Sequence, residues 1–421
     1  MAARPEEPAP WPMDPRGNAS SLPYTVADEG TALRRTARAA GDFGSSGPGF
    51  IGYQLKNIGD ALMCLPGLAL LKRLAPGCRT ALVARPAAAG LLAGSPDVDK
   101  IYVTAHASRG LGLKATFGLA REIGRERWDT AFGFDHKGRS GILSLLAGQR
   151  RRVASRIPGY EDPAWPWQCA ETGFAGEREG DTVPPSQIHM AEHQARLCAW
   201  ALDETYREGP GRLLRPRLAP PTPEAEEEAA GLYKLIPGDA VKAGLCLAGR
   251  QPEKCWHLLN WKAVAEGLYR SRGATFCVTG GPEDGIAARA LAAMTDAPVE
   301  DLTGRTTLGG FRALCARLDL FMSVDTGSAH LAALAGTPLL VVYTASSPAL
   351  WTPMSDRIRL LCYDWALKRQ GLPLEPPPGA APWKACGIPG PTDALAAAES
   401  LLDLNVHADD DQSGQTFHGP G

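Results

Sequence analysis

Apolar, strand-like segments alternate with helix-like segments along most of this chain. The first such unit is a strand at residues 49–55, a turn at 57–60 and a helix at 61–74. Strands are also expected at 80–84, 100–104, 130–134, 242–247, 275–279, 318–324 and 339–343, and helices at 87–93, 113–125, 190–202, 259–270, 285–294, 308–316 and 328–334. A parallel strand neighbour needs a crossover, usually a helix, so this alternation predicts an α/β fold with parallel sheets.

The length and one break in the rhythm predict two domains. A chain of 421 residues is too long for one typical domain. A passage rich in Pro and Glu at 210–228 interrupts the alternation, and a second series of strands follows it. The expected parts are a disordered extension at 1–46, a first domain at 47–205, a connection at 206–240, a second domain with a C-terminal helix at 241–405, and a disordered tail at 406–421.

Composition argues against several classes of protein. The 44 Lys and Arg residues nearly balance the 46 Asp and Glu residues, so no general nucleic-acid binder is expected. No run approaches the roughly 20 apolar residues of a membrane span, and residues 1–15 lack the apolar core of a signal peptide. The ten cysteines include no C-x-x-C pair, and several lie in apolar stretches, which is typical of reduced core residues. A cytoplasmic protein is expected.

One segment has the layout of an anion site. The apolar strand at 318–324 ends at Asp325 and Thr326, and a helix of small residues follows. The first amides of that helix would lack intrahelical partners, at the end where the dipole favours a phosphate: those of Gly327, Ser328 and Ala329. The hydroxyls of Thr326 and Ser328 would add donors, and His330 lies in the first turn. The alternative is that Asp325 or Thr326 only caps a buried helix.

Candidate polar residues also stand in the loops after three other predicted strands. Asp60 stands after the first strand, where it either faces a ligand or caps a helix. Lys254 and Trp256 form K-x-W before an amphipathic helix, although this Trp could equally be a packed side chain and the Lys a solvated one. Glu283 follows two glycines, which either let a ligand approach the backbone or form only a turn. The carboxyl ends of the strands should bring these loops to one cleft.

The order of these motifs resembles that of glycosyltransferase family 9, the heptosyltransferases that use ADP-heptose. The resemblance spans about residues 49–360 and rests on G-D-x-L-x-x-x-P (59–66), S-P-D-V-D-K-I (95–101), F-D-H-K-G-R-S (134–140), K-C-W (254–256), T-G-G-P-E (279–283), L-T-G-R-T-T-L (302–308) and S-V-D-T-G-S-A-H-L-A-A (323–333). It implies a GT-B fold, in which two Rossmann-like domains face each other. The first domain would bind the acceptor and the second the nucleotide sugar.

The resemblance also implies roles for individual residues. Asp60 would be the base that takes a proton from the acceptor hydroxyl, with inversion at the anomeric carbon. Lys254 would neutralise the leaving diphosphate together with the amides at 327–329, Thr326 and His330. Glu283 and Asp325 would hold hydroxyls of the sugar or the ribose. No cofactor and no divalent metal are expected, because Lys254 and a helix terminus supply positive potential.

Three features depart from this pattern or extend it. Gly249 and Arg250 stand where the family often has a small hydroxyl residue, so Arg250 either strengthens phosphate binding or indicates a different sugar. Lys137, Arg139 and Arg150 are candidate contacts for an anionic acceptor, with a solvated basic surface as the alternative. The Pro-rich segment 157–185 matches none of the motifs; it either shapes the acceptor side or is an ordered surface loop.

Rival functions remain at this point. The sequence His189 to His193 fits the zinc-peptidase pattern H-x-x-E-H, although no third ligand stands at a convincing spacing. A noncatalytic nucleotide-sugar binder is a second alternative, and transfer from another nucleotide sugar to a secondary metabolite or a protein is a third.

Expected partners are a nucleotide sugar, with ADP-heptose favoured, and a glycan, glycolipid or small-molecule acceptor. If the acceptor is a lipid, the protein would need only peripheral contact with the inner face of the membrane. The sequence shows no clear amphipathic helix that could serve as an anchor.

Overall fold

The structure is a computed structural model that describes residues 47–104, 112–155, 167–170, 188–204, 215–249, 251–364, 367, 383–386 and 389–413. These residues belong to one compact unit of the chain. The predictions for 1–46, for most of 157–185, for Arg250 and for 414–421 fall outside the described residues.

The first sheet has six parallel strands in the order β3-β2-β1-β4-β5-β6. The strands are β1 (Gly49–Gln54), β2 (Arg79–Ala84), β3 (Lys100–Val103), β4 (Thr130–Gly133), β5 (Arg151–Ser155) and β6 (Gln168–Ala170). The helices that accompany it are α1 (Ile58–Leu62), α2 (Leu65–Leu74), α3 (Pro86–Leu92), α4 (Leu113–Ile123), α5 (Gly138–Leu146) and α6 (Met190–Ala201).

The second sheet has seven parallel strands in the order β13-β12-β11-β10-β7-β8-β9. Its strands are β7 (Lys242–Cys246), β8 (Thr275–Val278), β9 (Val299–Asp301), β10 (Leu320–Val324), β11 (Leu339–Tyr343), β12 (Ile358–Tyr363) and β13 (Trp383–Cys386). Its helices are α7 (Pro223–Tyr233), α8 (Leu258–Arg272), α9 (Gly285–Met294), α10 (Leu308–Cys315), α11 (Gly327–Ala335), α12 (Pro348–Trp351) and α14 (Pro391–Ser413), with short 3₁₀ turns η4 (Pro252–Lys254) and η5 (Pro282–Asp284).

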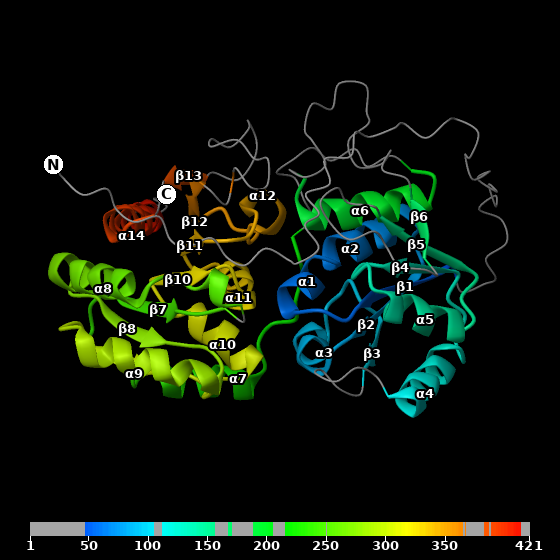
Figure 1. The fold of residues 1–421 in the computed structure, drawn as a ribbon, viewed down its shortest axis with the longest axis horizontal. Coiled ribbons are helices and arrows are strands. Elements are labelled where there is room, and N and C mark those ends of the chain that lie inside the picture. Colours follow the sequence, from blue (N-terminus) through cyan, green and yellow to red (C-terminus); the bar gives the residue numbers. More distant parts are fainter. Residues whose placement is uncertain are drawn as a thin grey trace, which may run out of the picture. The chain divides into compact units, whose positions relative to one another are not determined.

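Helices cover both faces of each sheet. Figure 1 shows α2 and α6 on one side of the first sheet and α4 and α5 on the other. In the second sheet, α8, α9 and α14 pack on one face through a buried cluster that includes Trp261 and Leu268. A larger cluster joins the opposite face of this sheet to the α2 and α6 face of the first sheet, and it contains both Phe132 and Phe321. The two sheets therefore share one apolar core.

The predicted first helix is divided in two. A single helix was expected at 61–74, whereas the structure has α1 and α2 with a turn at Met63 and Cys64. Pro66 lies in the first turn of α2. Because Pro lacks an N–H group, it cannot bond to the carbonyl four residues earlier, which favours a new helix start over a continuous helix. The break leaves α1 as a short element directly at the end of β1.

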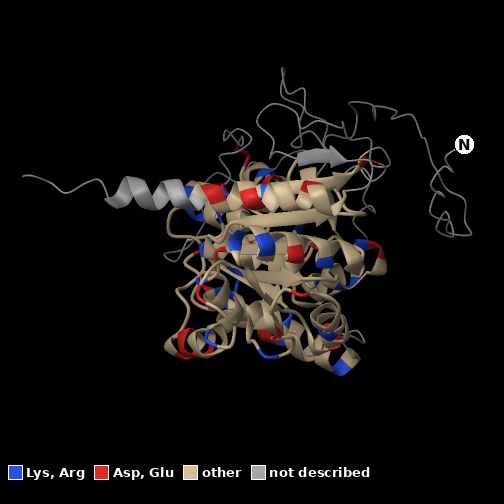
Figure 2. Cartoon of the chain, turned by 90° about the vertical axis from the view of Figure 1, so that its left-hand side faces the viewer, with Lys and Arg blue, Asp and Glu red and all other residues tan. Residues whose placement is uncertain are grey.

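Two further elements lie where no regular structure was expected. α7 lies within residues 206–240, which we predicted to be a connection, and packs against α10 of the second sheet. The side chain of Thr222 caps α7 by accepting a hydrogen bond from the amide of Ala225. α14 continues to Ser413, past residue 406 where the tail was predicted to begin. On the side that carries α8, α9 and α14, acidic and basic residues are interspersed (Figure 2).

The parallel α/β prediction is confirmed, and so are the predicted central strands, whose ends differ from the observed ones by up to two residues. The sequence did not reveal β5, β6, β9, β12 and β13, or helix α5. β5 and β12 lie next to an edge strand and have five and six residues, whereas β6, β9 and β13 are edge strands of only three or four residues. Short segments carry too little periodicity to be recognised from sequence.

Candidate active site

The start of α11 has the geometry predicted for an anion site. Thr326 is the N-cap residue, with extended backbone, and its side chain makes no hydrogen bond to the helix. The first-turn amides at 327–329 therefore have no cap and point out of the helix end. The Thr326 hydroxyl lies 3.2 Å from Ser323 Oγ and 3.7 Å from Cys246 Sγ.

The Ser328 hydroxyl, like that of Thr326, lies beside the Cys246 thiol. Burial raises the pKa of the Cys246 thiol, and hydrogen bonds with Ser328 and Thr326 oppose that rise. Both hydroxyls therefore lie near a buried thiol, and their expected role as phosphate donors stays a prediction. The amides at 327–329 are further candidate anion-binding groups of this helix end.

Lys254 forms an ion pair with Asp325. Lys254 Nζ lies 2.6 Å from Asp325 Oδ2, and Ser346 Oγ donates to the same oxygen. Asp325 is buried, with 7% exposure, while the Lys254 side chain remains 26% exposed. The carboxylate therefore holds the ammonium beside the start of α11 and leaves part of it accessible to a ligand.

The loop that carries Lys254 is anchored on both sides. Thr344 Oγ1 donates to the carbonyl of Glu253 at 2.6 Å. Trp256 is buried, its Nε1 donates to the carbonyl of Pro389 at 3.1 Å, and its ring meets that of Trp261 edge to face. The Trp of the K-x-W motif is thus a packed residue that positions the Lys.

Asp60 lies in the first turn of α1. Asn57 is the N-cap residue, and its backbone N–H group donates to Asp60 Oδ2 at 3.2 Å. Asp60 is thus not the N-cap, but its carboxylate does accept a capping bond. Burial raises its pKa, and this rise is opposed first by Lys56 and more weakly by Asn57 and Lys254. A half-buried carboxylate with a raised pKa is suited to accept a proton.

The N-terminal turns of α1 and α11 meet. A Cβ placed on Gly327 would lie 3.7 Å from Ile58 Cβ and 3.8 Å from the Gly59 nitrogen. A Cβ on Gly59 would lie only 2.8 Å from Cδ2 of His330. The two glycines therefore allow the helix that carries Asp60 to approach the helix end that presents the amides.

His330 is a neutral imidazole in this environment. Burial lowers its pKa to about 4, although Asp325 acts in the opposite direction. Its Nδ1 is buried without a hydrogen-bond partner among the described residues. At neutral pH the ring can donate or accept a hydrogen bond, but it adds no positive charge to the site.

The remaining predicted donor residues lie at the carboxyl ends of β7 and β8. A Cβ on Gly249 would be 3.2 Å from Lys254 Cβ and 3.5 Å from Thr326 Cγ2, so this position is closely surrounded. Glu283 is exposed in η5, after Gly280, whose φ of 154° favours glycine. The adjacent Asp284 accepts the amide of Gly281 at 2.8 Å.

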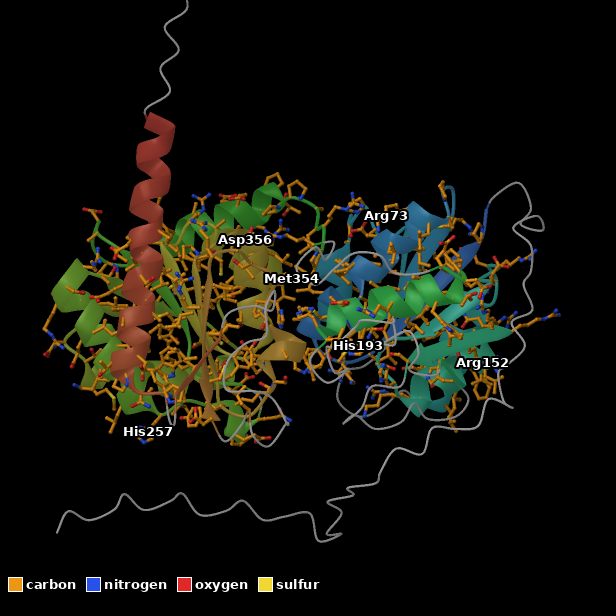
Figure 3. The ribbon with its side chains drawn as sticks, turned by 90° about the horizontal axis from the view of Figure 1, so that it is seen from above. Arg73, Arg152, His193, His257, Met354 and Asp356 are labelled. Atoms are coloured by element: carbon orange, nitrogen blue, oxygen red, sulfur yellow. The ribbon has the colours of Figure 1, made fainter. Side chains whose placement is uncertain are left out.

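The structure separates the three basic residues proposed for the acceptor. Lys137 is the N-cap residue of α5, and Arg139 Nη2 donates to the carbonyl of Leu55 at 3.1 Å, so both lie at the carboxyl edge with Asp60. Arg150 directly precedes β5 and lies at the opposite edge of the sheet. In Figure 3 the neighbouring Arg152, near the start of β5, lies beyond His193 of α6 as seen from the second sheet. The geometry thus places Arg150 outside the acceptor group.

The H-x-x-E-H pattern is used for structural contacts. His189 caps α6 by accepting from the amide of Ala191, and its Nε2 lies 2.8 Å from the carbonyl of Thr352. Glu192 is paired with Arg196 at 2.7 Å. Within the described part of the chain, no group of three acidic, Cys or His residues is arranged to hold a metal ion.

Sequence reasoning missed two polar residues of the site. Ser346 follows β11, and the rule that ligands bind beyond strand carboxyl ends would have identified its loop. Asp135 is buried after β4 and accepts from the amides of Leu55 and Lys137 and from the hydroxyl of Ser140. It holds the loops after β1 and β4 together, and no local signal predicts that long-range contact.

Comparison with known proteins agrees with this geometry. The model of glycosyltransferase family 9 (heptosyltransferase) matches residues 182–370. A lipopolysaccharide heptosyltransferase 3 from Escherichia coli is 30% identical over 156 residues, a match that covers 36% of this chain and 44% of the relative. The protein of the same name from Escherichia coli strain K12 is 22% identical over 354 residues, with 82% of this chain and 95% of the relative covered. Residues 182–370 of the chain are thus similar to glycosyltransferase family 9.

Solved structures of glycosyltransferase family 9 share the fold. A family 9 protein from Veillonella parvula DSM 2008 superposes with a TM-score of 0.65 at 17% identity, covering 85% of this chain and 98% of that one. The ADP-heptose lipopolysaccharide heptosyltransferase II of Escherichia coli gives 0.63 at 18% identity, with 85% and 99% covered. The heptosyltransferase WaaC of Escherichia coli with ADP gives 0.54 at 19% identity, with 75% and 93% covered. The two parallel sheets thus form the GT-B arrangement of this family.

No helix among the described residues is both long and apolar enough to cross a membrane.

Proposed function

We propose that this protein is an inverting, metal-independent glycosyltransferase. It would move a heptose or a related sugar from an ADP-sugar to an acceptor hydroxyl, in the synthesis of lipopolysaccharide, capsule or another glycoconjugate. The observation that carries the proposal is the meeting of α1 and α11, which brings Asp60 to the anion-binding helix end beside Lys254.

Asp60 is the proposed base. Its carboxylate takes the proton of the acceptor hydroxyl as that oxygen attacks the anomeric carbon of the donor. The bond from this carbon to the diphosphate breaks on the opposite side, so the configuration inverts. The raised pKa of Asp60 makes it a stronger base than an exposed Asp.

Lys254 and α11 are proposed to stabilise the leaving diphosphate. Negative charge grows on the phosphate oxygen that leaves with ADP. The Lys254 ammonium and the amides at 327–329 are positioned before the reaction, because Asp325 and Ser346 fix the former and the helix fixes the latter. This positive potential takes the place that a divalent cation has in other transferases.

The substrates are proposed from the relatives. An ADP-heptose is favoured as donor because ADP is bound to one structural neighbour and the curated relatives are lipopolysaccharide heptosyltransferases. The acceptor is then a glycan or glycolipid of the cell envelope, and the enzyme would work in the cytoplasm. Glu283, Gly249 and His330 would contact the donor, and Lys137 and Arg139 the acceptor.

A donor panel tests this proposal. Thermal stability of the wild type and of Asp60→Asn is measured with ADP-heptose and with other ADP-, GDP-, UDP- and dTDP-sugars, each with and without EDTA. We expect selective, EDTA-insensitive stabilisation of both proteins by ADP-heptose. Preference for another nucleotide would overturn the donor assignment, and loss of stabilisation in EDTA would overturn metal independence.

The same variant separates a transferase from a noncatalytic binder. Transfer is measured by release of ADP in the presence of envelope glycolipid acceptors. We expect Asp60→Asn to bind donor normally and to lose transfer by about 10²-fold or more, the usual contribution of a general base. Unchanged turnover would disprove the role of Asp60, and no turnover by the wild type with any acceptor would support the noncatalytic alternative.

A further inference from the structure

Two helices of the first sheet expose large apolar side chains. On α4, Leu113 is 80% and Phe117 is 56% exposed, and on α5 the exposed residues are Ile142, Leu145 and Leu146. The two helices pack beside each other. We call the surface formed by these five residues the α4–α5 face. Isolated apolar residues are common on protein surfaces, but a contiguous group of this kind often marks an interaction site.

The spacing shows where these side chains lie on the two helices. Leu113 and Phe117 are four residues apart and so lie on one face of α4, whereas Leu119, Ala120 and Ile123 are buried against the sheet. On α5, Ile142 has the same relationship to Leu146, and the buried Leu143 points inward. α5 is therefore apolar on the side that the core does not use. On α4 the two exposed apolar side chains flank the buried row, and the outermost positions carry the exposed Lys114 and Arg121. The sequence alone concealed this, because only the structure shows which apolar residues remain outside.

Basic residues border the α4–α5 face. Lys114 and Arg121 are exposed on α4, and Arg139 is exposed on α5. Arg150 and Arg151, which follow α5, are also exposed. Within the two helices the single acidic residue is Glu122. This contrasts with the side that carries α8, α9 and α14, where both signs are mixed (Figure 2).

The face begins near the proposed acceptor site. α4 follows β3 and α5 follows β4, so both helices start at the carboxyl edge of the first sheet. Arg139 reaches the carbonyl of Leu55, which directly precedes the loop to Asp60. A surface bound to the α4–α5 face would thus lie beside the edge at which the acceptor is expected.

We propose that the α4–α5 face binds an anionic membrane surface. Leu113, Phe117 and the apolar residues of α5 would enter the boundary between headgroups and acyl chains, and the bordering cations would remain among the lipid phosphates. A protein partner or a second copy of the chain would need no such excess of positive charge. The proposed function gives this contact its purpose, delivery of a lipid-linked acceptor, but binding itself does not depend on the reaction.

The test is co-sedimentation of the full chain with vesicles. One set contains phosphatidylcholine alone and the other equal parts of phosphatidylcholine and phosphatidylglycerol. We expect binding to the anionic vesicles that weakens as salt is added, because screening removes the contribution of the cations. Leu113→Glu with Phe117→Glu, and separately Ile142→Glu with Leu146→Glu, should each lower the bound fraction about tenfold or more.

The control is a pair of exposed apolar residues on the second sheet. Leu259 on α8 is 56% and Ile286 on α9 is 75% exposed, and neither belongs to the α4–α5 face. Leu259→Glu with Ile286→Glu should bind vesicles like the wild type. Equal loss in the control, or no wild-type binding to anionic vesicles, would overturn the proposal.

Two readouts separate the remaining outcomes. Sedimentation velocity without lipid measures the oligomeric state of the wild type and of both α4–α5 variants. A dimeric wild type with monomeric variants would overturn the proposal, because the face would then be an interface between copies. Donor-induced thermal stabilisation should be unchanged in these variants, which shows that they are folded. Vesicle binding therefore tests the membrane proposal and donor binding tests the proposed function, so that either can fail while the other holds.

Discussion

Gly59 lies against the imidazole of His330, so closely that a Cβ on residue 59 would be 2.8 Å from Cδ2 of that ring. Gly59 precedes the proposed base Asp60, and His330 stands one residue after the helix-end amides at 327–329. The contact therefore fixes the position of Asp60 relative to the start of α11. In the proposed reaction both elements take part, although they are far apart in sequence.

Gly59→Ala should disturb this contact. The ring is buried and cannot move freely, so we expect about 1–3 kcal/mol lower stability, as for other overpacked sites, and reduced kcat/KM. His330→Ala in the same chain should restore part of the stability by providing space. Gly90→Ala on α3 is the control, because nothing lies within 4 Å of a Cβ there. Urea unfolding and initial rates are measured, and equal behaviour of the variants at 59 and 90 would contradict the prediction.

The pH dependence of transfer should report Asp60. The base works as a carboxylate, so activity is lost as pH falls through its pKa, and burial places that pKa above the ordinary value for Asp. Lys56 is the charge that most opposes this rise. Lys56→Gln should therefore move the acid limb of the kcat/KM profile to higher pH. A shift to lower pH, or none, would argue that another group controls the limb.

Lys254→Ala should remove a ligand contact and unpair a buried carboxylate. We expect weaker ADP binding by calorimetry and about 10²-fold slower transfer or more, together with lower stability because Asp325 loses its partner. Asp325→Asn keeps the ammonium but loses its fixed position. In a double-mutant cycle the two losses should be strongly non-additive. Additive effects would show that the ion pair does not organise the site.

Asp135→Asn should destabilise the first sheet at its carboxyl edge. The two oxygens of Asp135 accept from Leu55, Lys137 and Ser140, and the Asn amide would direct N–H groups at existing donors. We expect a loss of about 1–3 kcal/mol in the free energy of unfolding, measured with urea. Asp356→Asn is the control, because that side chain is 84% exposed and its ion pair with Arg215 should contribute little.

Much of the fold and part of the site could be predicted from the sequence. The alternation of segments predicted parallel sheets, and the small-residue helix after 318–324 predicted an unprotected helix end at Thr326. These are local properties, because they depend on side-chain periodicity and on backbone groups at one helix terminus. The division of the first helix was also local, but Pro66 was overlooked.

Other features depend on contacts that no sequence window contains. The sequence predicted a phosphate as the partner of the Ser328 hydroxyl, and it did not reveal that the buried Cys246 thiol of β7 also lies beside this hydroxyl. Arg150 was grouped with Lys137, yet it lies at the opposite edge of the sheet because α5 separates the two positions. Charge and hydroxyl chemistry can be read from a residue type, whereas its partner cannot.

The sequence by itself determined the α/β architecture, the resemblance to glycosyltransferase family 9 and the residues available for acid–base and phosphate chemistry. The tertiary structure decided that α1 and α11 meet at Gly59 and His330, that Asp325 holds Lys254, and that α4 and α5 expose large apolar side chains. The physical reason is the range of the interactions. Periodicity, helix dipoles and side-chain chemistry are set within a few residues, but burial, ion pairing and pKa shifts depend on which distant segments the packed core brings together.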